Sequence, residues 1–361
     1  MQYKKIDGYI LAKYLKTFLL AMALIIVIVI TFDISEKLDD FLGNHAPFRE
    51  IVFNYYLNFI PGFVNLYSPL FIFISVIFFT SKMAGNTEII AILGSGISYK
   101  RLLRPYLHGA SIVALVVLIL GNFVIPWSNQ FLSEFEGKYI KTMKRSYYSK
   151  VHFQPAKNTQ IYTESFDVNQ SIAFNFSKDV YDENGALLER FAAESISYDT
   201  TDGLWNANAY SHRVIKGKKE KLTFINQGKI DVGLKPEDFQ KYHTDIQTLN
   251  TPKLIKHIQR ESMRGSGAVI VSKIELYQRL LNPLAIIVMS FIGVAISSRK
   301  TRGGIGIHLA IGISIAFGFI VFMKVTTVFA TNGNLSAFLA VLLPQIVFSI
   351  AAAYLIKTAP K

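Results

Sequence analysis

Cysteine is absent from this sequence of 361 residues. Its absence excludes disulfide bonds, thiolate zinc sites and cysteine nucleophiles. The seven histidines are scattered, and none of them has a carboxylate or a second histidine at the spacing that metal ligands show. We therefore expect no metal centre in this chain.

Motifs that bind nucleotides or perform hydrolysis are also missing. The chain lacks a G-x-x-x-x-G-K-[ST] sequence, so it cannot cradle ATP phosphates in a P-loop. It also lacks a G-x-S-x-G nucleophile motif, and its apolar segments lack the paired carboxylates of a proton pump. We expect no catalytic residue and no cofactor, and any work that the protein does requires energy from a partner.

Charged residues are few, at 17% of the chain, whereas 51% of the residues are hydrophobic. The apolar residues form six blocks, at 14–34, 59–80, 105–126, 277–297, 304–329 and 336–356. Each block is long enough to cross a bilayer core of about 30 Å as a helix of roughly 20 residues. The sequence predicts a helical membrane protein with six transmembrane helices, three on each side of a polar central region.

Basic residues indicate the orientation of these helices, because cytoplasmic loops are enriched in lysine and arginine. The loops on one side carry only Lys37 and Arg49. The other side carries Lys4, Lys5, Lys13, Lys16, Lys82, Lys100, Arg101, Arg104, Arg299, Lys300, Arg302, Lys357 and Lys361. We expect both termini to be cytoplasmic and the central region to lie outside. The net charge of +13 mostly reflects this asymmetry and does not indicate nucleic-acid binding.

The central region changes its periodicity along the chain. Residues 127–150 are typical of a helical continuation of the third apolar block. Alternating patterns then predict strands at 159–163, 171–181, 188–198, 204–215 and 221–232. Turn signals that contain Gly185, Gly203 and Gly217 separate the later strands. Trp205, Ala207 and Ala209 should share one face of their strand, with Tyr210 on the other. The sequence predicts a β-sandwich or an open barrel, followed by a polar helix over 251–264 and a glycine hinge at 265–267.

The loop 81–104 predicts a short amphipathic helix at about 84–96. Asn86 can cap this helix, and Glu88 falls in its first turn, where a carboxylate suits the helix dipole. Ile89, Ile90 and Leu93 form an apolar stripe, and Gly94 and Gly96 end the helix. Such a helix can bind a groove on another protein or lie on the bilayer surface. Composition alone leaves both possibilities open.

A wider spacing pattern resembles a known family. Pro61, Pro69, Glu88 and Gly96 follow one another across the second block and this loop, and the motif Glu275-x-x-x-Arg279-x-x-x-Pro283 begins the fourth block. Pro126 closes the third block. The pattern resembles the lipopolysaccharide export permeases of the LptF/LptG type, and the resemblance covers essentially the whole chain.

The resemblance implies a permease subunit of an ABC transporter in the inner membrane of a Gram-negative-type bacterium. Two related permeases would pair, dock on a cytoplasmic ATPase dimer, extract lipopolysaccharide and pass it to periplasmic bridge proteins. Residues 1–126 and 273–361 would form the membrane helices, and residues 127–272 a periplasmic all-β, jellyroll-like domain. The helix around Glu88, with Ile89, Ile90, Leu93 and Gly96, would couple the permease to the ATPase.

Two other functions are compatible with the sequence. A mechanotransmission subunit would move a periplasmic partner without transporting a substrate, but six helices divided three and three favour transport. A membrane enzyme or receptor is disfavoured by the lack of a catalytic motif, although a receptor needs none. Lipid bound to the purified protein, together with a bound ATPase, would distinguish these functions.

Two lysines are candidate contacts for the phosphates of the substrate. Lys37 lies just beyond the first apolar block, where pairing with the neighbouring acids is the alternative. Lys324 lies well inside the fifth block, where it can bind substrate, pair with another helix or reach the interface. The same block carries Gly306, Ala310, Ser314 and Gly318 at four-residue spacing. This small-residue seam allows close helix packing, either within one protomer or at a gate against the partner permease.

Overall fold

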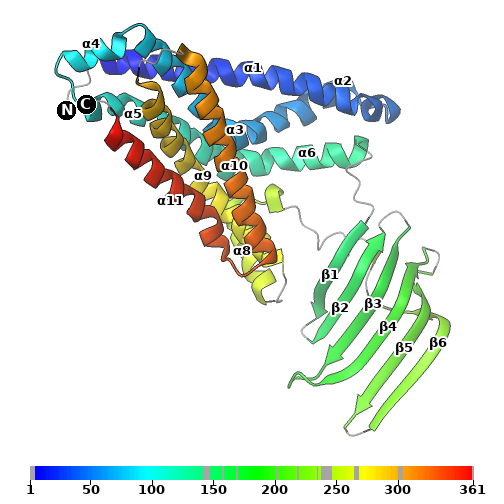
Figure 1. The fold of residues 1–361 in the computed structure, drawn as a ribbon. Coiled ribbons are helices and arrows are strands. Elements are labelled where there is room, and N and C mark those ends of the chain that lie inside the picture. Colours follow the sequence, from blue (N-terminus) through cyan, green and yellow to red (C-terminus); the bar gives the residue numbers. More distant parts are fainter. Residues whose placement is uncertain are drawn as a thin grey trace. The chain divides into compact units, whose positions relative to one another are not determined.

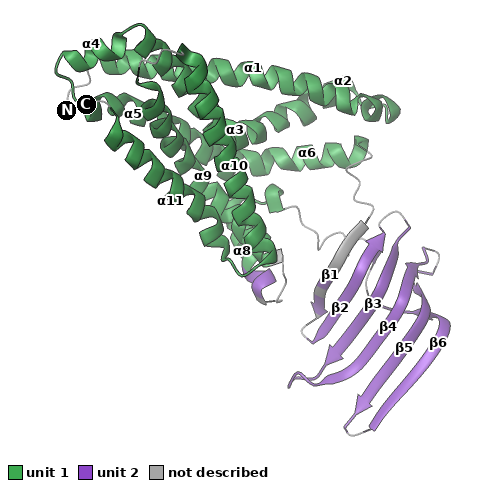
Figure 2. Ribbon diagram, in the orientation of Figure 1, with its two compact units in different colours: residues 1–140, 246–258, 267–361 green, residues 141–245, 259–266 purple. Residues whose placement is uncertain are grey.

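The computed structural model describes residues 5–140, 147–156, 158–167, 170–200, 202–217, 219–233, 235–236, 246–263, 268–299 and 304–359. These residues divide into a helical unit and a β unit, which Figure 2 colours separately. Four of the basic residues used for orientation lie outside the described residues, as does the predicted hinge at 265–267. The four are Lys4, Lys300, Arg302 and Lys361.

Six helical segments in the described chain are long and apolar enough to cross a membrane, which confirms the predicted number. The segments are α1 (Lys5–Gly43), α2–η1–α3 (Phe48–Glu50, Ile51–Tyr56 and Leu57–Gly85), α5–η2–α6 (Tyr99–Ile119, Leu120–Val124 and Ile125–Tyr139), α9 (Ala268–Ser297), α10 (Gly304–Asn332) and α11 (Ala337–Thr358). Most of them extend beyond the apolar blocks, because polar residues continue the helices at their ends. Both termini lie at the same end of the helical unit as the short helix α4 (Glu88–Gly94; Figure 1).

Pro126 closes the third apolar block, but the helix continues past it, and the predicted helical continuation is confirmed as far as Tyr139. Pro126 lies at the start of α6, directly after the π-helical turn η2. Proline removes one backbone donor and crowds the preceding turn. The wider π-helical turn accommodates that crowding, so the segment continues to Tyr139.

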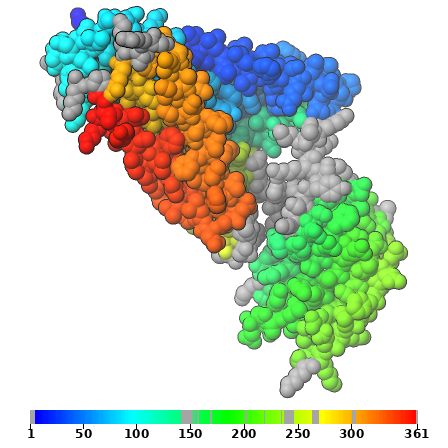
Figure 3. Space-filling view, in the orientation of Figure 1, coloured from blue at the N-terminus to red at the C-terminus, as the bar shows by residue number. Residues whose placement is uncertain are grey.

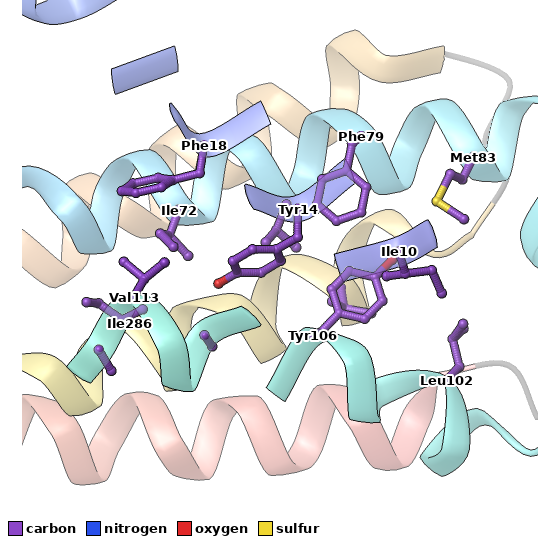
Figure 4. Close-up of a cluster of buried hydrophobic side chains, with 14 of the residues drawn as sticks. Ile10, Tyr14, Phe18, Ile72, Phe79, Met83, Leu102, Tyr106, Val113 and Ile286 are labelled. Atoms are coloured by element: carbon purple, nitrogen blue, oxygen red, sulfur yellow. The ribbon is translucent and has the colours of Figure 1, made fainter. Parts of the chain in front are cut away.

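Helix α9 lies at the centre of the helical unit, where it packs against α3, α5 and α11. Helix α1 packs against α3 and α5, and α10 packs against α3 and α11. In the main hydrophobic cluster, Tyr14 of α1 lies edge-on to Phe79 of α3 and Tyr106 of α5 (Figure 4). The Tyr14 hydroxyl also forms a 2.7 Å hydrogen bond with Ser290 of α9. This contact joins the N-terminal and C-terminal halves of the unit.

The described strands of the β unit form one antiparallel sheet in the order β1 to β6, each paired with its neighbour in sequence. The strands are β1 (Tyr147–Ala156), β2 (Thr159–Asp167), β3 (Ile172–Tyr181), β4 (Leu187–Tyr198), β5 (Trp205–Lys216) and β6 (Lys219–Ile230). A central β domain is thus confirmed. The predicted helix over 127–150 is wrong at its end, because α6 stops at Tyr139 and Tyr147 already begins a strand. The predicted turns at Gly185, Gly203 and Gly217 are confirmed by positive φ angles.

One face of the sheet carries a core that includes Trp205, Ala207 and Phe176. The prediction that Ala209 continues this face is wrong. Ala209 is exposed and has a φ of 44°, and this left-handed backbone interrupts the alternation of side chains along β5. Tyr210 consequently packs on the core face instead of the opposite one.

Candidate functional site

The loop between α3 and α5 contains a single short helix, α4 (Glu88–Gly94). The predicted cap by Asn86 is wrong. Thr87 occupies the capping position with a φ of 62° and provides no side-chain cap, while Asn86 Nδ2 donates to Glu88 Oε1 at 3.4 Å. Gly96, with a φ of 86°, forms the turn after the helix. Two residues with left-handed φ therefore enclose α4, which is shorter than the predicted 84–96.

Glu88 has partners within its own chain. The Tyr9 hydroxyl donates to Glu88 Oε2 at 2.9 Å, and Lys13 Nζ lies 3.2 Å from the same oxygen. Partial burial opposes ionisation of the Glu88 carboxyl, but hydrogen bonds from Tyr9, Lys13 and Asn86, with the charge of Lys13, outweigh it and lower its pKa. Glu88 is therefore an ionised group that connects α4 to α1. Sequence reasoning missed this contact because the partners are more than 70 residues away.

The residues of the apolar stripe on α4 lie in different environments. Ile89 is buried in the main hydrophobic cluster, Leu93 is half-buried, and Ile90 is 55% exposed. Ile89, Ile90, Leu93 and Gly96 all line an open cavity of about 1550 Å³. Its remaining wall comes from the start of α5 and the ends of α9 and α11, and includes Lys100, Ser298, Arg299, Ala353, Ile356 and Lys357. The cavity thus combines an apolar floor with basic residues.

Lys37 lies in a second polar cluster, near the C-terminal end of α1. Its Nζ donates to Asp33 Oδ1 at 2.7 Å and also contacts the Tyr55 hydroxyl, and the Tyr56 hydroxyl donates to Asp33 Oδ2 at 3.0 Å. The π-helical turn η1 directs both consecutive tyrosines toward α1. The pairing with acids that the sequence analysis weighed as an alternative is present, with Asp33 as the partner.

Lys324 lies on the outer face of α10, far from Lys37 in sequence and without a hydrogen bond or ion pair to the Lys37 cluster. Its side chain is exposed, and no hydrogen bond or ion pair joins it to another described residue. Exposed apolar residues surround it on the same helix, including Val321, Val325 and Val328. A lysine in such a setting needs an external anionic partner or access to the interface.

The small-residue seam also lies on the outer face of α10, which forms the orange ridge in Figure 3. Gly306, Ala310, Ser314 and Gly318 are all exposed. Close packing within the protomer instead involves Gly312, where a Cβ would collide with Ile77 of α3. The seam is therefore available to another helix.

Arg279 has a role that sequence reasoning did not assign. Its guanidinium is buried and donates to Glu275 Oε1 at 2.8 Å. It also donates to the carbonyl of Leu249 at 2.7 Å and to that of Ile246, in the turn η4 (Ile246–Thr248), at 3.2 Å. Helix α8 (Thr251–Met263) follows this turn. The Glu-x-x-x-Arg motif of α9 thus holds the segment that returns from the β unit.

A family model described as "Lipopolysaccharide export system permease LptF/LptG" matches residues 8–358 of the chain. The protein belongs to this permease family. A search of curated proteins found no match. The match covers all six apolar helices and the inserted β unit, so the permease is a multi-pass inner-membrane protein of lipopolysaccharide export.

We predict that Arg279→Met destabilises this permease. The substitution leaves Glu275 and two backbone carbonyls without their donor, and breaking a buried ion pair of this kind typically costs about 3–5 kcal/mol. The thermal midpoint of the detergent-purified protein should therefore fall. Arg213→Met removes the exposed pair with Glu220 and is the control, with little expected change. Equal midpoints for both variants would contradict the structural role of Arg279.

Proposed function

We propose that this chain is the permease subunit of an ABC transporter that extracts lipopolysaccharide from the inner membrane. A cytoplasmic ATPase dimer supplies the energy by docking on α4. The observation that carries the proposal is the cavity beside α4, where an exposed Ile90 and an apolar floor meet basic residues. A chain without a nucleotide-binding motif needs such a docking surface if ATP is to drive it.

The orientation of the chain follows from the same surface. Lys100, Arg299 and Lys357 line the cavity, and lysine and arginine are enriched at cytoplasmic ends. Both termini lie at this end of the helical unit. We therefore assign both termini and α4 to the cytoplasm and the β unit to the periplasm.

The Lys37 cluster is the proposed contact for the lipid A phosphates. Lys37 and Asp33 have side chains that are 16% and 14% exposed, so their charges are only weakly screened. A phosphate can replace Asp33 at the ammonium because it offers a stronger multidentate acceptor. Lys324 lies 20 residues beyond Gly304, about 30 Å along α10, and would meet a second phosphate near the periplasmic boundary.

The remaining partners contact other surfaces. We assign the exposed seam of α10 to a paralogous permease, because small residues allow a second helix to approach closely. We propose that the β unit is itself a jellyroll-like domain that passes acyl chains to periplasmic bridge proteins. The support for this role is a cavity of about 380 Å³ on its sheet, where the apolar side chains of Phe191 and Ile225 lie beside charged residues such as Lys178.

Reporter fusions test the orientation. We expect a fusion within residues 170–200 to be active only as a periplasmic reporter, and a fusion after residue 361 only as a cytoplasmic one. A periplasmic C-terminus would remove the basis for docking an ATPase at α4.

Substitutions on α4 test the docking surface. We expect Ile90→Asp to reduce recovery of the co-expressed ATPase by at least roughly tenfold, because it places a charge in an apolar contact. Glu88→Ala should weaken docking or uncouple hydrolysis from export, with normal insertion. Leu222→Asp is the control, because it adds a charge at an exposed apolar position of the β unit. Normal ATPase recovery and export with both α4 variants would reject α4 as the docking element.

Photo-crosslinking tests the substrate site. A crosslinking residue at position 37 or 324 should capture lipopolysaccharide in a working complex, and one at position 16 should not. Lys324→Glu should reduce capture from position 37, and Lys37→Glu should reduce capture from position 324, because the new carboxylate repels phosphate. Both variants should also reduce export, while ATPase docking is unchanged. No capture from either position would reject these contacts and leave the family assignment intact.

A further inference from the structure

Helix α1 is bound at its N-terminal end by two separate ion pairs. Arg101 at the start of α5 forms a bidentate pair with the buried Asp7, through bonds of 2.7 and 2.6 Å. Tyr9 and Lys13 bind Glu88, the first residue of α4. The family function assigned above makes no use of Asp7, Tyr9 or Lys13.

Tyr9 and Lys13 form one unit against the Glu88 carboxylate. They are four residues apart and therefore lie on the same face of α1. The Lys13 ammonium also lies 4.2 Å from the centre of the Tyr9 ring. The two side chains thus fix both the charge and the orientation of the carboxylate, so a movement of α4 displaces them together.

Helix α1 can carry a displacement over a long distance. It contains 39 residues without proline, which corresponds to about 58 Å of continuous helix. By contrast, α3 and α5 contain prolines and adjoin π-helical turns. The buried residues of α1 are concentrated in its first half, up to Met22, and the next buried residue is Phe41. The middle of α1 is therefore held by few contacts within the protomer.

The opposite end of this continuous helix contains the Asp33–Lys37 pair. Lys37 lies 24 residues after Lys13, or about 36 Å along the helix axis. Helix α4 is enclosed by the turns at Thr87 and Gly96, so it can tilt as a short rigid piece. A tilt of α4 would pull or release α1 through the Glu88 contacts.

We propose that Tyr9 and Lys13 are positioning residues that transmit the movement of α4 to α1, and through α1 to the Asp33–Lys37 cluster. The proposal rests on the ATPase-docked permease proposed above. In this arrangement Glu88 has two tasks, since its exposed side meets the ATPase and its other side holds α1. The ion pair between Asp7 and Arg101 holds the N-terminal end of α1, and the rest of the helix moves relative to that end.

Substitution of Lys13 is the first test, with reconstituted complexes in lipopolysaccharide-containing proteoliposomes. We expect Lys13→Met to lower ATP-dependent release of lipopolysaccharide by roughly tenfold, within the range of typical coupling energies. ATPase recovery and the rate of ATP hydrolysis should stay close to the wild-type values. Tyr9→Phe should give a smaller loss in the same direction, and Lys13→Arg should restore release because it keeps the ion pair.

Lys16→Met is the matched control, because it removes an exposed lysine from the same helix, three residues away. Normal release by Lys13→Met overturns the proposal, and so does an equal loss by Lys16→Met. Loss of ATPase recovery by Lys13→Met also overturns it, because Lys13 would then support docking and not transmission. Failure of the docking surface itself is detected separately, by normal ATPase recovery with Ile90→Asp.

Discussion

Polar groups inside a bilayer must find partners within the protein, because hydrocarbon offers no hydrogen bonds. In this chain that constraint positions α9. Tyr14 of α1 bonds Ser290 of α9, and Tyr99 of α5 bonds Ser298 of the same helix region at 3.2 Å. These contacts connect helices that are about 200 or more residues apart in sequence. The cavity beside α4, which is lined in part by Ser298 and Arg299 at the end of α9, depends on α9 being held in this way.

Three basic residues of the chain differ in their burial and in their partners. Arg279 is buried, and all three of its guanidinium nitrogens donate within an internal network that holds a backbone segment. Lys37 is paired with one carboxylate, that of Asp33. Lys324 has no partner among the described residues and faces outward. Burial and pairing therefore distinguish Arg279, Lys37 and Lys324 from one another, which their positions in the sequence alone do not.

Much of the fold could be predicted because the relevant signals are local. Long apolar blocks identify the helices, and glycines in polar turn sequences identify the turns at Gly185, Gly203 and Gly217, where the structure has positive φ angles. Strand β1 was missed because its sequence, YYSKVHFQPA, lacks a clear alternation of polar and apolar residues. Ala209 was placed on the wrong face because its left-handed backbone conformation cannot be recognised in the alternation of polar and apolar residues.

The candidate site was harder to predict, since its decisive contacts are between distant segments. The sequence identified Glu88 as an acid at the start of a helix, but its partners Tyr9 and Lys13 lie on another helix. For the same reason, the four-residue spacing of Gly306, Ala310, Ser314 and Gly318 identified a seam but not the face of the protomer on which it lies. Only the packing of Gly312 against α3 shows which face of α10 is turned inward.

The order of strands in the β unit has a consequence for how the chain folds. Every described strand pairs with its neighbour in sequence. The contacts of the sheet therefore join residues that are close in sequence, and such contacts form quickly. The helical unit has the opposite character, because α9 must pack against α3 and α5, which precede the whole inserted sheet. During synthesis the sheet can therefore form before α9 has been made. Helices α1, α3 and α5 cannot complete their packing until α9 is present. The interface around α9 is the last part of the molecule to close, and it is the part most exposed to errors of assembly.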